Sequence, residues 1–362
     1  MQSFVFKSAP FKYVPLRMAR FHPLKVSEIR PETTEAVSIK FEVPATLQPE
    51  FLYKQGQYLT LKMLINGQEI RRSYSICTAP HEKEWRVAVK IVEGGLVSGY
   101  LNRSLKIGDT IDVMTPMGSF NTPLSGAHEK NYVLWAGGSG ITPMMSILKS
   151  VLYIEKKSHV RLIYANRNAD SSIFKTELER LQSQYPAFEI EWIYDTVQGP
   201  LNASTCNTLI QHVPHTHTEH FICGPGPLME TVKTALLNSG INQKHIHIEY
   251  FNTVIQDTAL QDSTNKTFAG TCQVKVIQYG IETEFELPAS SISVLDAAIE
   301  AGVDAPYSCK GAVCCTCRGK IISGSADMKA NFALTDDEVK SGYVLTCQAY
   351  PTSEHLVIDY DA

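Results

Sequence analysis

The sequence has no long uninterrupted apolar run. Its most apolar window, residues 132–154, is broken by three glycines and by Pro143, so it does not predict a membrane-spanning helix. Residues 1–20 carry four basic side chains and two prolines but no apolar stretch of the kind found in secretory signals. These absences lead us to expect a protein without membrane insertion, located in the cytoplasm.

Internal repeats, low-complexity tracts and nucleic-acid-binding signatures are also missing. What remains is an ordinary globular composition over 362 residues, long enough for two or three domains. The formal net charge of −4 is unevenly distributed, because residues 271–362 contain 13 acidic and 6 basic side chains. This part could attract a basic partner or the basic remainder of the chain, although it could equally be a solvated surface.

Nine cysteines are present, and four of them are crowded into residues 309–317, which indicates a reducing compartment rather than a disulfide scaffold. Four residues separate Cys309 from Cys314, and two separate Cys314 from Cys317. Cys347 follows after a further 29 residues. This is the spacing of a plant-type 2Fe-2S cluster, and Cys315 is out of register with it. Structural zinc is the alternative, although zinc sites of four cysteines usually pair two Cys-x-x-Cys arms.

Residues 21–127 alternate short β-like runs with proline and glycine turns, which predicts an antiparallel β-barrel. Within it, Arg72-Ser73-Tyr74-Ser75 offers a guanidinium suited to phosphate, an aromatic ring and hydroxyl groups. Val89-Lys90 and then Gly95-Leu96-Val97-Ser98 could supply backbone donors and a helix start capped by Ser98, a place for a pyrophosphate. Each pattern alone could also be ordinary surface.

Residues 128–251 alternate apolar strands with amphipathic helices, which predicts a doubly wound α/β domain with a parallel sheet. One strand runs into Gly137-Gly138-Ser139-Gly140-Ile-Thr142-Pro143, a phosphate-cradling turn in which we expect Thr142 to cap the next helix and Pro143 to begin it. The glycine spacing differs from the Rossmann fingerprint. Ligands bind at the carboxyl ends of parallel strands, where this turn, Asn166-Arg167 and Cys223-Gly224-Pro225 fall.

The last third of the chain begins with residues 252–270, a polar segment that predicts a flexible linker. Residues 271–362 then show two strands, a helix and the cysteine loop. This order is typical of an α+β domain of the β-grasp type.

Taken together, the motifs at 72–75, 95–98, 137–143 and 223–225 and the cysteine loop resemble the ferredoxin-NADP reductase superfamily with a C-terminal plant-type ferredoxin domain. The domain order is similar to that in the reductase subunits of phenylacetyl-CoA monooxygenases (epoxidases). The resemblance implies an N-terminal extension (1–20), an FAD-binding barrel (21–127), a nicotinamide-binding domain (128–251), a linker (252–270) and a 2Fe-2S domain (271–362).

The resemblance also implies roles for single residues. Arg72 would bind the FAD phosphates, Tyr74 would pack on the flavin, and Ser75 would hydrogen-bond near flavin N5. Cys223 would lie beside the nicotinamide. The implied catalytic residues are Ser75, Cys223, Glu249 and Phe251; further implied contacts are Ser73, Val89, Lys90, Gly95, Leu96, Val97 and Ser98 for FAD, Gly137, Gly138, Ser139, Gly140, Thr142, Pro143, Gly224 and Pro225 for the dinucleotide, and Cys309, Cys314, Cys317 and Cys347 for the cluster.

Arg167 follows the second strand of the nicotinamide-binding domain, where a ribose 2'-phosphate would lie. A bidentate arginine there favours NADPH, with NADH as the alternative donor.

The implied activity is electron transfer from NAD(P)H through FAD and a 2Fe-2S cluster to the oxygenase component of a multicomponent monooxygenase, in first place a phenylacetyl-CoA 1,2-epoxidase. Because a hydride carries two electrons and the cluster accepts one, the protein must position its cofactors for single-electron steps. Three alternatives stay open: a reductase of another hydroxylase or desaturase, acting on aromatic rings, alkanes or fatty acids; a non-catalytic electron-relay or docking subunit; and an interaction protein with a zinc-binding tail.

Overall fold

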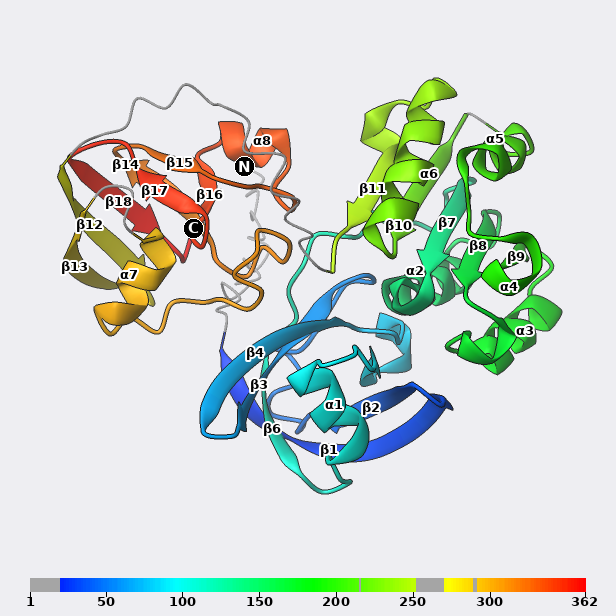
Figure 1. Cartoon of the computed structure of the whole chain (residues 1–362), viewed down its shortest axis with the longest axis horizontal. Helices are drawn as coiled ribbons and strands as arrows, with labels where there is room; N and C mark the ends of the chain where they lie inside the picture. The colour runs from blue at the N-terminus through cyan, green and yellow to red at the C-terminus, as the bar shows by residue number, and fades with distance from the viewer. Residues whose placement is uncertain (1–19, 215, 252–269, 289–291) are drawn as a thin grey trace, which may run out of the picture.

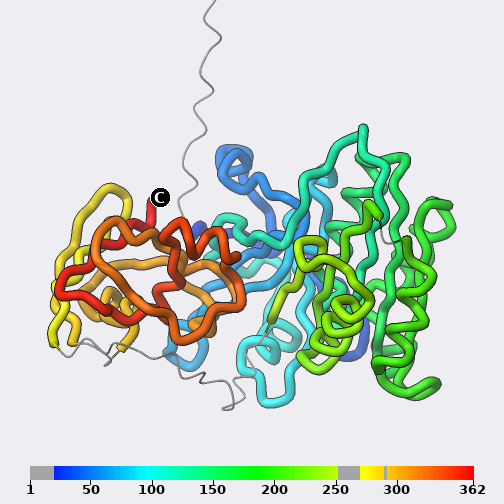
Figure 2. The backbone as a smooth tube through the Cα atoms, turned by 90° about the horizontal axis from the view of Figure 1, so that it is seen from above, coloured from blue at the N-terminus to red at the C-terminus, as the bar shows by residue number. Residues whose placement is uncertain are grey.

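The computed structural model describes residues 20–214, 216–251, 270–288 and 292–362. The expected N-terminal extension and linker lie outside the described residues, except for the last residue of each. The described chain forms three units, which we call the barrel (21–114), the parallel-sheet unit (131–249) and the C-terminal unit (271–359). In Figures 1 and 2 the parallel-sheet unit and the C-terminal unit lie at opposite ends of the long axis, with the barrel between them.

Antiparallel strands in the order β4-β3-β6-β1-β2-β5 form the barrel. An isolated bridge between Ile76 and Val87 joins the region after β4 to β5 and so closes the sheet. Alternate side chains fill the interior, among them the fully buried Ile39 and Leu61. The elements are β1 (Phe21–Thr33), β2 (Ala36–Glu42), β3 (Tyr58–Ile65), β4 (Gln68–Ser75), η1 (Pro80–Glu82), β5 (Trp85–Lys90), α1 (Leu96–Arg103) and β6 (Thr110–Met114).

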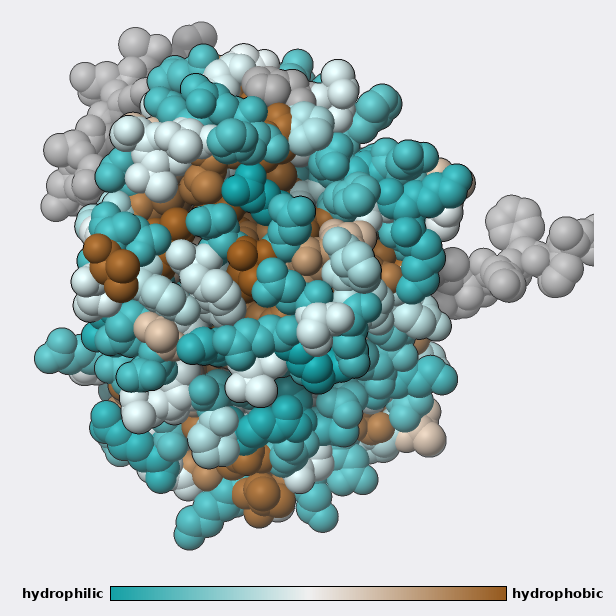
Figure 3. All heavy atoms as spheres, turned by 90° about the vertical axis from the view of Figure 1, so that its right-hand side faces the viewer, coloured by the Kyte–Doolittle hydropathy of each residue, from teal (hydrophilic) through white to brown (hydrophobic). Residues whose placement is uncertain are grey.

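The parallel-sheet unit has the strand order β11-β10-β7-β8-β9, with every neighbouring pair parallel. Helices α2 and α3 share one core with the sheet, and α5 and α6 share another, so helices cover both faces. Figure 3 shows the molecule from the end at which the parallel-sheet unit lies. This face is largely hydrophilic, with apolar residues between the hydrophilic ones. The elements are β7 (Asn131–Gly137), η2 (Gly138–Gly140), α2 (Ile141–Ile154), β8 (His159–Asn166), η3 (Ala169–Ser171), α3 (Lys175–Gln184), β9 (Phe188–Tyr194), α4 (Asp195–Gln198), α5 (Ala203–Gln211), β10 (Thr218–Cys223), α6 (Gly226–Asn238), η4 (Gln243–His245) and β11 (Ile246–Glu249).

A mixed sheet in the order β13-β12-β18-β14-β16 forms the C-terminal unit, with β12 parallel to β18. A separate pair, β15 and β17, lies beside it. Within the described ranges of the chain, no helix is long and apolar enough to cross a membrane. The elements are β12 (Thr271–Gln278), β13 (Ile281–Pro288), α7 (Val294–Glu300), β14 (Arg318–Ser323), β15 (Ala326–Met328), α8 (Asp336–Lys340), β16 (Tyr343–Leu345), β17 (Ala349–Pro351) and β18 (His355–Asp359).

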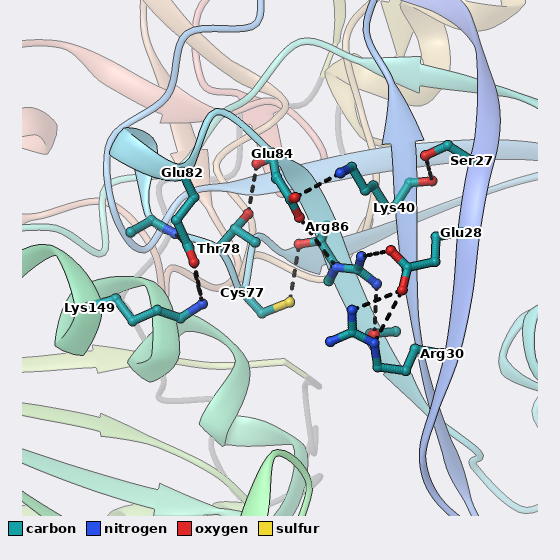
Figure 4. A network of polar contacts seen from close by, with 12 residues as sticks. Ser27, Glu28, Arg30, Lys40, Cys77, Thr78, Glu82, Glu84, Arg86 and Lys149 are labelled. Carbon is teal, nitrogen blue, oxygen red and sulfur yellow. Dashed lines mark hydrogen bonds and ion pairs between the residues drawn. The ribbon is translucent and has the colours of Figure 1, made fainter. Parts of the chain in front are cut away.

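Polar side chains join the barrel to helix α2. Lys149 Nζ lies 2.9 Å from Glu82 Oε1, and the Ser146 hydroxyl donates to the Thr78 carbonyl at 2.6 Å. Figure 4 shows the Lys149–Glu82 pair next to the buried guanidinium of Arg86, which is paired with Glu28 and Glu84. Because a buried charge needs such partners, this network fixes the wall of the barrel that faces the parallel sheet.

The predicted start of helix α1 is wrong by a few residues. The helix begins at Leu96 after the N-cap Gly95, and Ser98 lies inside its first turn. There the Ser98 hydroxyl accepts the N–H of Val92 at 3.1 Å and donates to the Gly95 carbonyl at 3.3 Å. Ser98 thus stabilises the approach to the helix instead of capping it.

The predicted start of helix α2 is also wrong. The helix begins at Ile141, two residues before Pro143, and directly continues the 3₁₀ turn η2. The Ile141 N–H already bonds to the carbonyls of that turn, and Thr142 Oγ1 donates back to the Ser139 carbonyl at 3.0 Å. Because the glycine turn supplies the first partners, no side-chain cap is needed.

Two glycines with similar backbone angles allow a test of the barrel's packing. Gly56 has φ +80°, and a Cβ there would lie 1.9 Å from the Phe120 carbonyl oxygen; Gly67 has φ +77°, with nothing within 4 Å. We expect Gly67→Ala to lower the free energy of unfolding by about 1–2 kcal/mol, because alanine is disfavoured in the left-handed conformation but meets no neighbour there. Gly56→Ala should lower the thermal unfolding midpoint further, because Phe120 must also move. Equal midpoints in the two variants would contradict this packing.

Candidate functional site

Strand β4 presents two different sets of side chains, because alternate residues face opposite sides of a strand. Arg72 and Tyr74 share one side. The Arg72 side chain is exposed, with Nη1 donating to the Arg71 carbonyl at 2.8 Å, while burial raises the pKa of Tyr74. On the other side, Ser73 donates to Ser308 Oγ of the C-terminal unit at 2.8 Å. The Ser73 side chain therefore lies at an interface between units, which leaves only its backbone for the expected contact with FAD.

The expected catalytic residues from β4, β10 and β11 come together. Ser75 Oγ donates to Glu249 Oε2 at 3.2 Å, and Cys223 is the strand partner of Glu249. Desolvation raises the pKa of Glu249 to about 8, although the hydrogen bond from Ser75 opposes this shift. Burial also raises the pKa of the Cys223 thiol. Phe251, two residues after Glu249, is half-buried against the core beneath α2. The arrangement offers a carboxyl group that can take up and release a proton near neutral pH.

The loops after β7 and β10 pack backbone against backbone. A Cβ on Gly140 would lie 2.0 Å from the Cys223 carbonyl oxygen, and a Cβ on Gly137 would lie 2.7 Å from Pro225 Cδ. A Cβ on Gly224 would lie 3.0 Å from Gly137 Cα. Only glycine fits at these positions. The two loops therefore lie side by side at the carboxyl ends of adjacent strands, where the strand order of the sheet reverses and open α/β sheets bind their ligands.

Two basic side chains converge beside the glycine turn. Arg167 forms an ion pair with Glu35, which lies between β1 and β2, and Lys90 Nζ lies 3.9 Å from the same carboxylate. Burial, and next the charge of Arg167, lower the pKa of Lys90. A Cβ on Gly138 would lie 4.0 Å from Lys90 Nζ. Because the Arg167 side chain is 59% exposed, its guanidinium is accessible to an anion from solvent.

Other residues expected at FAD lie along β5 and α1. The side chains of Val89 and Val97 fill the barrel core, and Ser98 is also buried. Leu96 is 44% exposed. A Cβ on Gly95 would lie 2.5 Å from Ser98 Oγ, so glycine is required for this turn. Backbone groups and the Leu96 side chain, rather than the valine side chains, are therefore available to a ligand here.

Asn166 is a further candidate for ligand binding. The sequence places it at the carboxyl end of a strand but indicates no role for its side chain. It ends β8 immediately before Arg167, and its side chain is buried. Within the described residues, the amide has no hydrogen bond of good geometry; it interacts with the Tyr164 hydroxyl, which donates to the Gly138 carbonyl at 3.0 Å. A bound ligand could supply the hydrogen bonds that this buried amide lacks.

The cysteine loop has a backbone that turns its amides toward the sulfurs. Lys310, Ala312 and Cys315 all have positive φ, at 50°, 63° and 53°. This conformation is uncommon for residues other than glycine and persists only where the surroundings demand it. Within the loop, the Gly311 N–H donates to Cys309 Sγ at 3.2 Å. Amides directed at sulfur are what a thiolate ligand requires.

The four expected ligands approach one another as two pairs, because Cys309 is hydrogen-bonded to Cys314 and Cys317 to Cys347. The contact with Cys314 and the loop amides lower the pKa of Cys309, which favours its thiolate. No group of three or more His, Cys, Asp or Glu side chains in the described ranges is placed to hold one metal ion. Two pairs match the two iron atoms of a 2Fe-2S cluster, with two cysteines for each iron.

The segment that carries Cys347 is bonded directly to the loop. The Thr346 N–H and Oγ1 both donate to the Cys317 carbonyl, at 3.0 and 2.9 Å. Cys315 is directed elsewhere, with its Sγ donating to the Ala333 carbonyl at 3.2 Å. The fifth cysteine of this region is thus separate from the two pairs.

Comparison with known proteins identifies three domain families in chain order. They are an oxidoreductase FAD-binding domain (residues 23–122), an oxidoreductase NAD-binding domain (134–234) and a 2Fe-2S iron-sulfur cluster binding domain (276–352). One of the subunits of 1,2-phenylacetyl-CoA epoxidase from Escherichia coli (strain K12) is 39% identical over 357 residues, covering 95% of this chain and 99% of that protein. The chain belongs to the ferredoxin-NADP reductase superfamily. It is a flavin and iron-sulfur oxidoreductase with domains for FAD, a nicotinamide nucleotide and a 2Fe-2S cluster.

Other members of this superfamily share the whole architecture. The ferredoxin reductase component of 3-ketosteroid-9-alpha-monooxygenase from Rhodococcus rhodochrous is 34% identical, covering 93% of this chain and 96% of that protein. The solved phthalate dioxygenase reductase superposes with a TM-score of 0.59 at 25% identity, covering 94% of this chain and 98% of that chain. The predicted fold class is therefore confirmed: an antiparallel barrel, a doubly wound parallel sheet and a C-terminal 2Fe-2S domain.

The cluster ligands can be tested with two buried cysteines of the C-terminal unit. We expect Cys347→Ser to abolish the iron-sulfur absorbance, because one iron loses a thiolate, while FAD-dependent ferricyanide reduction continues. Cys272→Ser is the matched control, since Cys272 is fully buried in β12, outside the two thiol pairs, and its loss should leave the spectrum unchanged. The assignment would be refuted if Cys347→Ser kept the iron-sulfur absorbance, or if it lost FAD-dependent ferricyanide reduction together with that absorbance.

Proposed function

We propose that this reductase passes electrons from NADPH, through FAD and a 2Fe-2S cluster, to the oxygenase component of a phenylacetyl-CoA 1,2-epoxidase. The supporting observation is a convergence of three units around one cavity of about 410 Å³, lined among others by Tyr58, Glu249 and Cys314. The identity of 39% with a protein of an epoxidase supports this acceptor over the monooxygenases served by more distant relatives. Nine unpaired cysteines fit a reducing compartment, and we assign the protein to the cytoplasm.

The proposed division of labour follows the three units, with FAD at 21–127, the nicotinamide at 128–251 and the cluster at 271–362. When bound, FAD accepts the hydride as two electrons and the cluster takes up one electron at a time. Arg72 binds FAD phosphate through its exposed guanidinium, Tyr74 packs against the flavin, and Ser75 donates a hydrogen bond near N5. Cys309, Cys314, Cys317 and Cys347 hold the cluster.

The paired loops at Gly137–Pro143 and Cys223–Pro225 would hold the dinucleotide. Cys223 would orient the nicotinamide, and the buried amide of Asn166 would be available to the ribose region. Arg167 receives the 2'-phosphate, which would replace its present partner Glu35. A phosphate dianion offers this guanidinium more charge and more acceptor atoms than a single carboxylate, and this favours NADPH.

Glu249 manages the proton that accompanies electron transfer. Below about pH 8 its carboxyl group is protonated, and Ser75 joins it by a hydrogen bond to the end of β4. With FAD bound, the Glu249 carboxylate, through Ser75, would accept the proton released near the flavin and pass it toward solvent. Phe251 shields this route from solvent on the side of α2.

The donor preference can be tested at Arg167. We expect Arg167→Ala to raise the KM for NADPH much more than the KM for NADH, because only NADPH carries the 2'-phosphate. Arg180→Ala is the control, since Arg180 lies exposed on α3 in an ion pair with Glu177 and should leave both KM values unchanged. Equal changes for the two nucleotides in Arg167→Ala would rule out the 2'-phosphate contact.

The proton route can be tested through the pH dependence of turnover. The pKa of Glu249 is raised to about 8, so its carboxylate fraction grows as the pH rises through that value. We expect kcat for NADPH-dependent ferricyanide reduction to rise between about pH 7 and 9 in the wild type, and Glu249→Gln to show a lower kcat without this rise. Glu230→Gln, on α6, serves as control. A pH profile unchanged by Glu249→Gln would exclude the role.

A further inference from the structure

Tyr58 connects the barrel to the cysteine loop. It is the first residue of β3 and is only 5% exposed. Its hydroxyl donates to the Cys314 carbonyl and lies 3.0 Å from Thr316 Oγ1. Thr316 Oγ1 in turn donates to Cys314 Sγ at 3.2 Å. A barrel side chain is therefore hydrogen-bonded to the backbone of an expected cluster ligand and, through one hydroxyl, to its sulfur.

The barrel holds the Tyr58 ring from several sides. Tyr58 is the strand partner of Ser75, and its backbone exchanges hydrogen bonds with Met117 at 2.8 and 3.1 Å. Gly118 has φ +115°, and a Cβ there would lie 2.9 Å from two ring atoms of Tyr58. The ring thus fills space that any other residue at position 118 would occupy. Its hydroxyl is aimed at the loop from a point directly across the ladder from Ser75.

Other contacts in the same interface stop short of the cysteines. The Arg71 guanidinium lies 4.1 Å from the Tyr307 ring centroid and 4.9 Å from that of Phe21, and its Nη2 lies 3.4 Å from Asp304. These contacts press the C-terminal unit against the barrel. Within the described residues they reach neither a sulfur nor the backbone of an expected ligand, so they separate general docking from the specific action of Tyr58.

We propose that Tyr58 is a positioning residue for electron transfer between FAD and the 2Fe-2S cluster: its hydroxyl fixes the Cys314 loop against the barrel beside Ser75 and, with Thr316, sets the hydrogen bonding of the Cys314 sulfur. This inference rests on the proposed roles of Ser75 at the flavin and Cys314 at the cluster. The step moves one electron and makes or breaks no bond. Its rate therefore depends on the separation of the two sites and on their potentials, and Tyr58 acts on both.

The proton count gives the direction of the effect on the cluster. Two hydroxyl protons serve three contacts: the Tyr58 proton goes to the Cys314 carbonyl, and the Thr316 proton is shared between the Tyr58 oxygen and Cys314 Sγ. Without the Tyr58 hydroxyl, the Thr316 proton is left to the sulfur alone. Because hydrogen bonds to sulfur set the potential of such clusters, Tyr58→Phe should raise it and Thr316→Val should lower it.

The test uses the purified full-length protein loaded with FAD and cluster. NADPH is mixed with it anaerobically, and flavin bleaching and cluster bleaching are followed as separate phases. We expect Tyr58→Phe to slow the cluster phase relative to the flavin phase by on the order of tenfold, because the cysteine loop would no longer be held in place against the barrel. Tyr53→Phe is the matched control, since it removes another buried hydroxyl of the barrel, bonded to Thr78, far along the chain from the cysteine loop.

A redox titration followed by electron paramagnetic resonance gives a second readout, which a purely structural role would not move. Tyr58→Phe and Thr316→Val should shift the cluster potential in opposite directions, whereas Arg71→Met, which weakens the same interface, should leave it unchanged. A cluster phase in Tyr58→Phe equal to that of Tyr53→Phe would overturn the proposal. If Tyr58→Phe fails to fold, an unchanged potential in Thr316→Val overturns it. Wild-type protein whose flavin bleaches while its cluster stays oxidised would instead contradict the proposed function.

Discussion

The alternation of side chains along strand β4 is the constraint on which the rest of the site depends. Arg72 and Tyr74 point to one side, and Arg71 and Ser73 point to the other, where they contact the C-terminal unit. A single strand therefore carries the residues proposed for FAD next to residues that support the C-terminal unit, and Ser75 lies on the same side as Arg71 and Ser73. Moving either set of residues would move the other, so β4 couples the expected FAD site to the docking of the C-terminal unit.

Much of this architecture could be predicted from the sequence, because it depends on local patterns. Period-two strands, the glycine turn at 137–140 and the cysteine spacing at 309–317 are features of neighbouring residues, and they gave the three folds in their order. The helix starts at Ser98 and Thr142 were wrong because side-chain caps were expected where glycine turns already supply hydrogen bonds.

Contacts between units could not be predicted in the same way. The alternation in β4 shows that Ser73 and Tyr74 face opposite sides, but only the packed structure shows that Ser308 meets Ser73. The role of Tyr58 depends on residues 256 positions later in the chain. The local sequence around Asn166 is that of an ordinary strand end, and only the packed structure shows that its amide is buried without a hydrogen bond of good geometry within the described residues. In each case the deciding neighbour is distant in sequence, and no local pattern encodes it.

The contact between Tyr58 and the cysteine loop has a consequence for the biogenesis of the protein. Domains generally fold as units during synthesis, and the N-terminal ones fold first. We therefore expect the barrel, in which Met117 and Gly118 hold Tyr58, to fold before Cys314 leaves the ribosome. The surface of the barrel that contacts the cysteine loop is therefore formed before the loop itself. The iron-sulfur domain is the last piece to mature, and it docks onto a template that the earlier part of the same chain has already prepared.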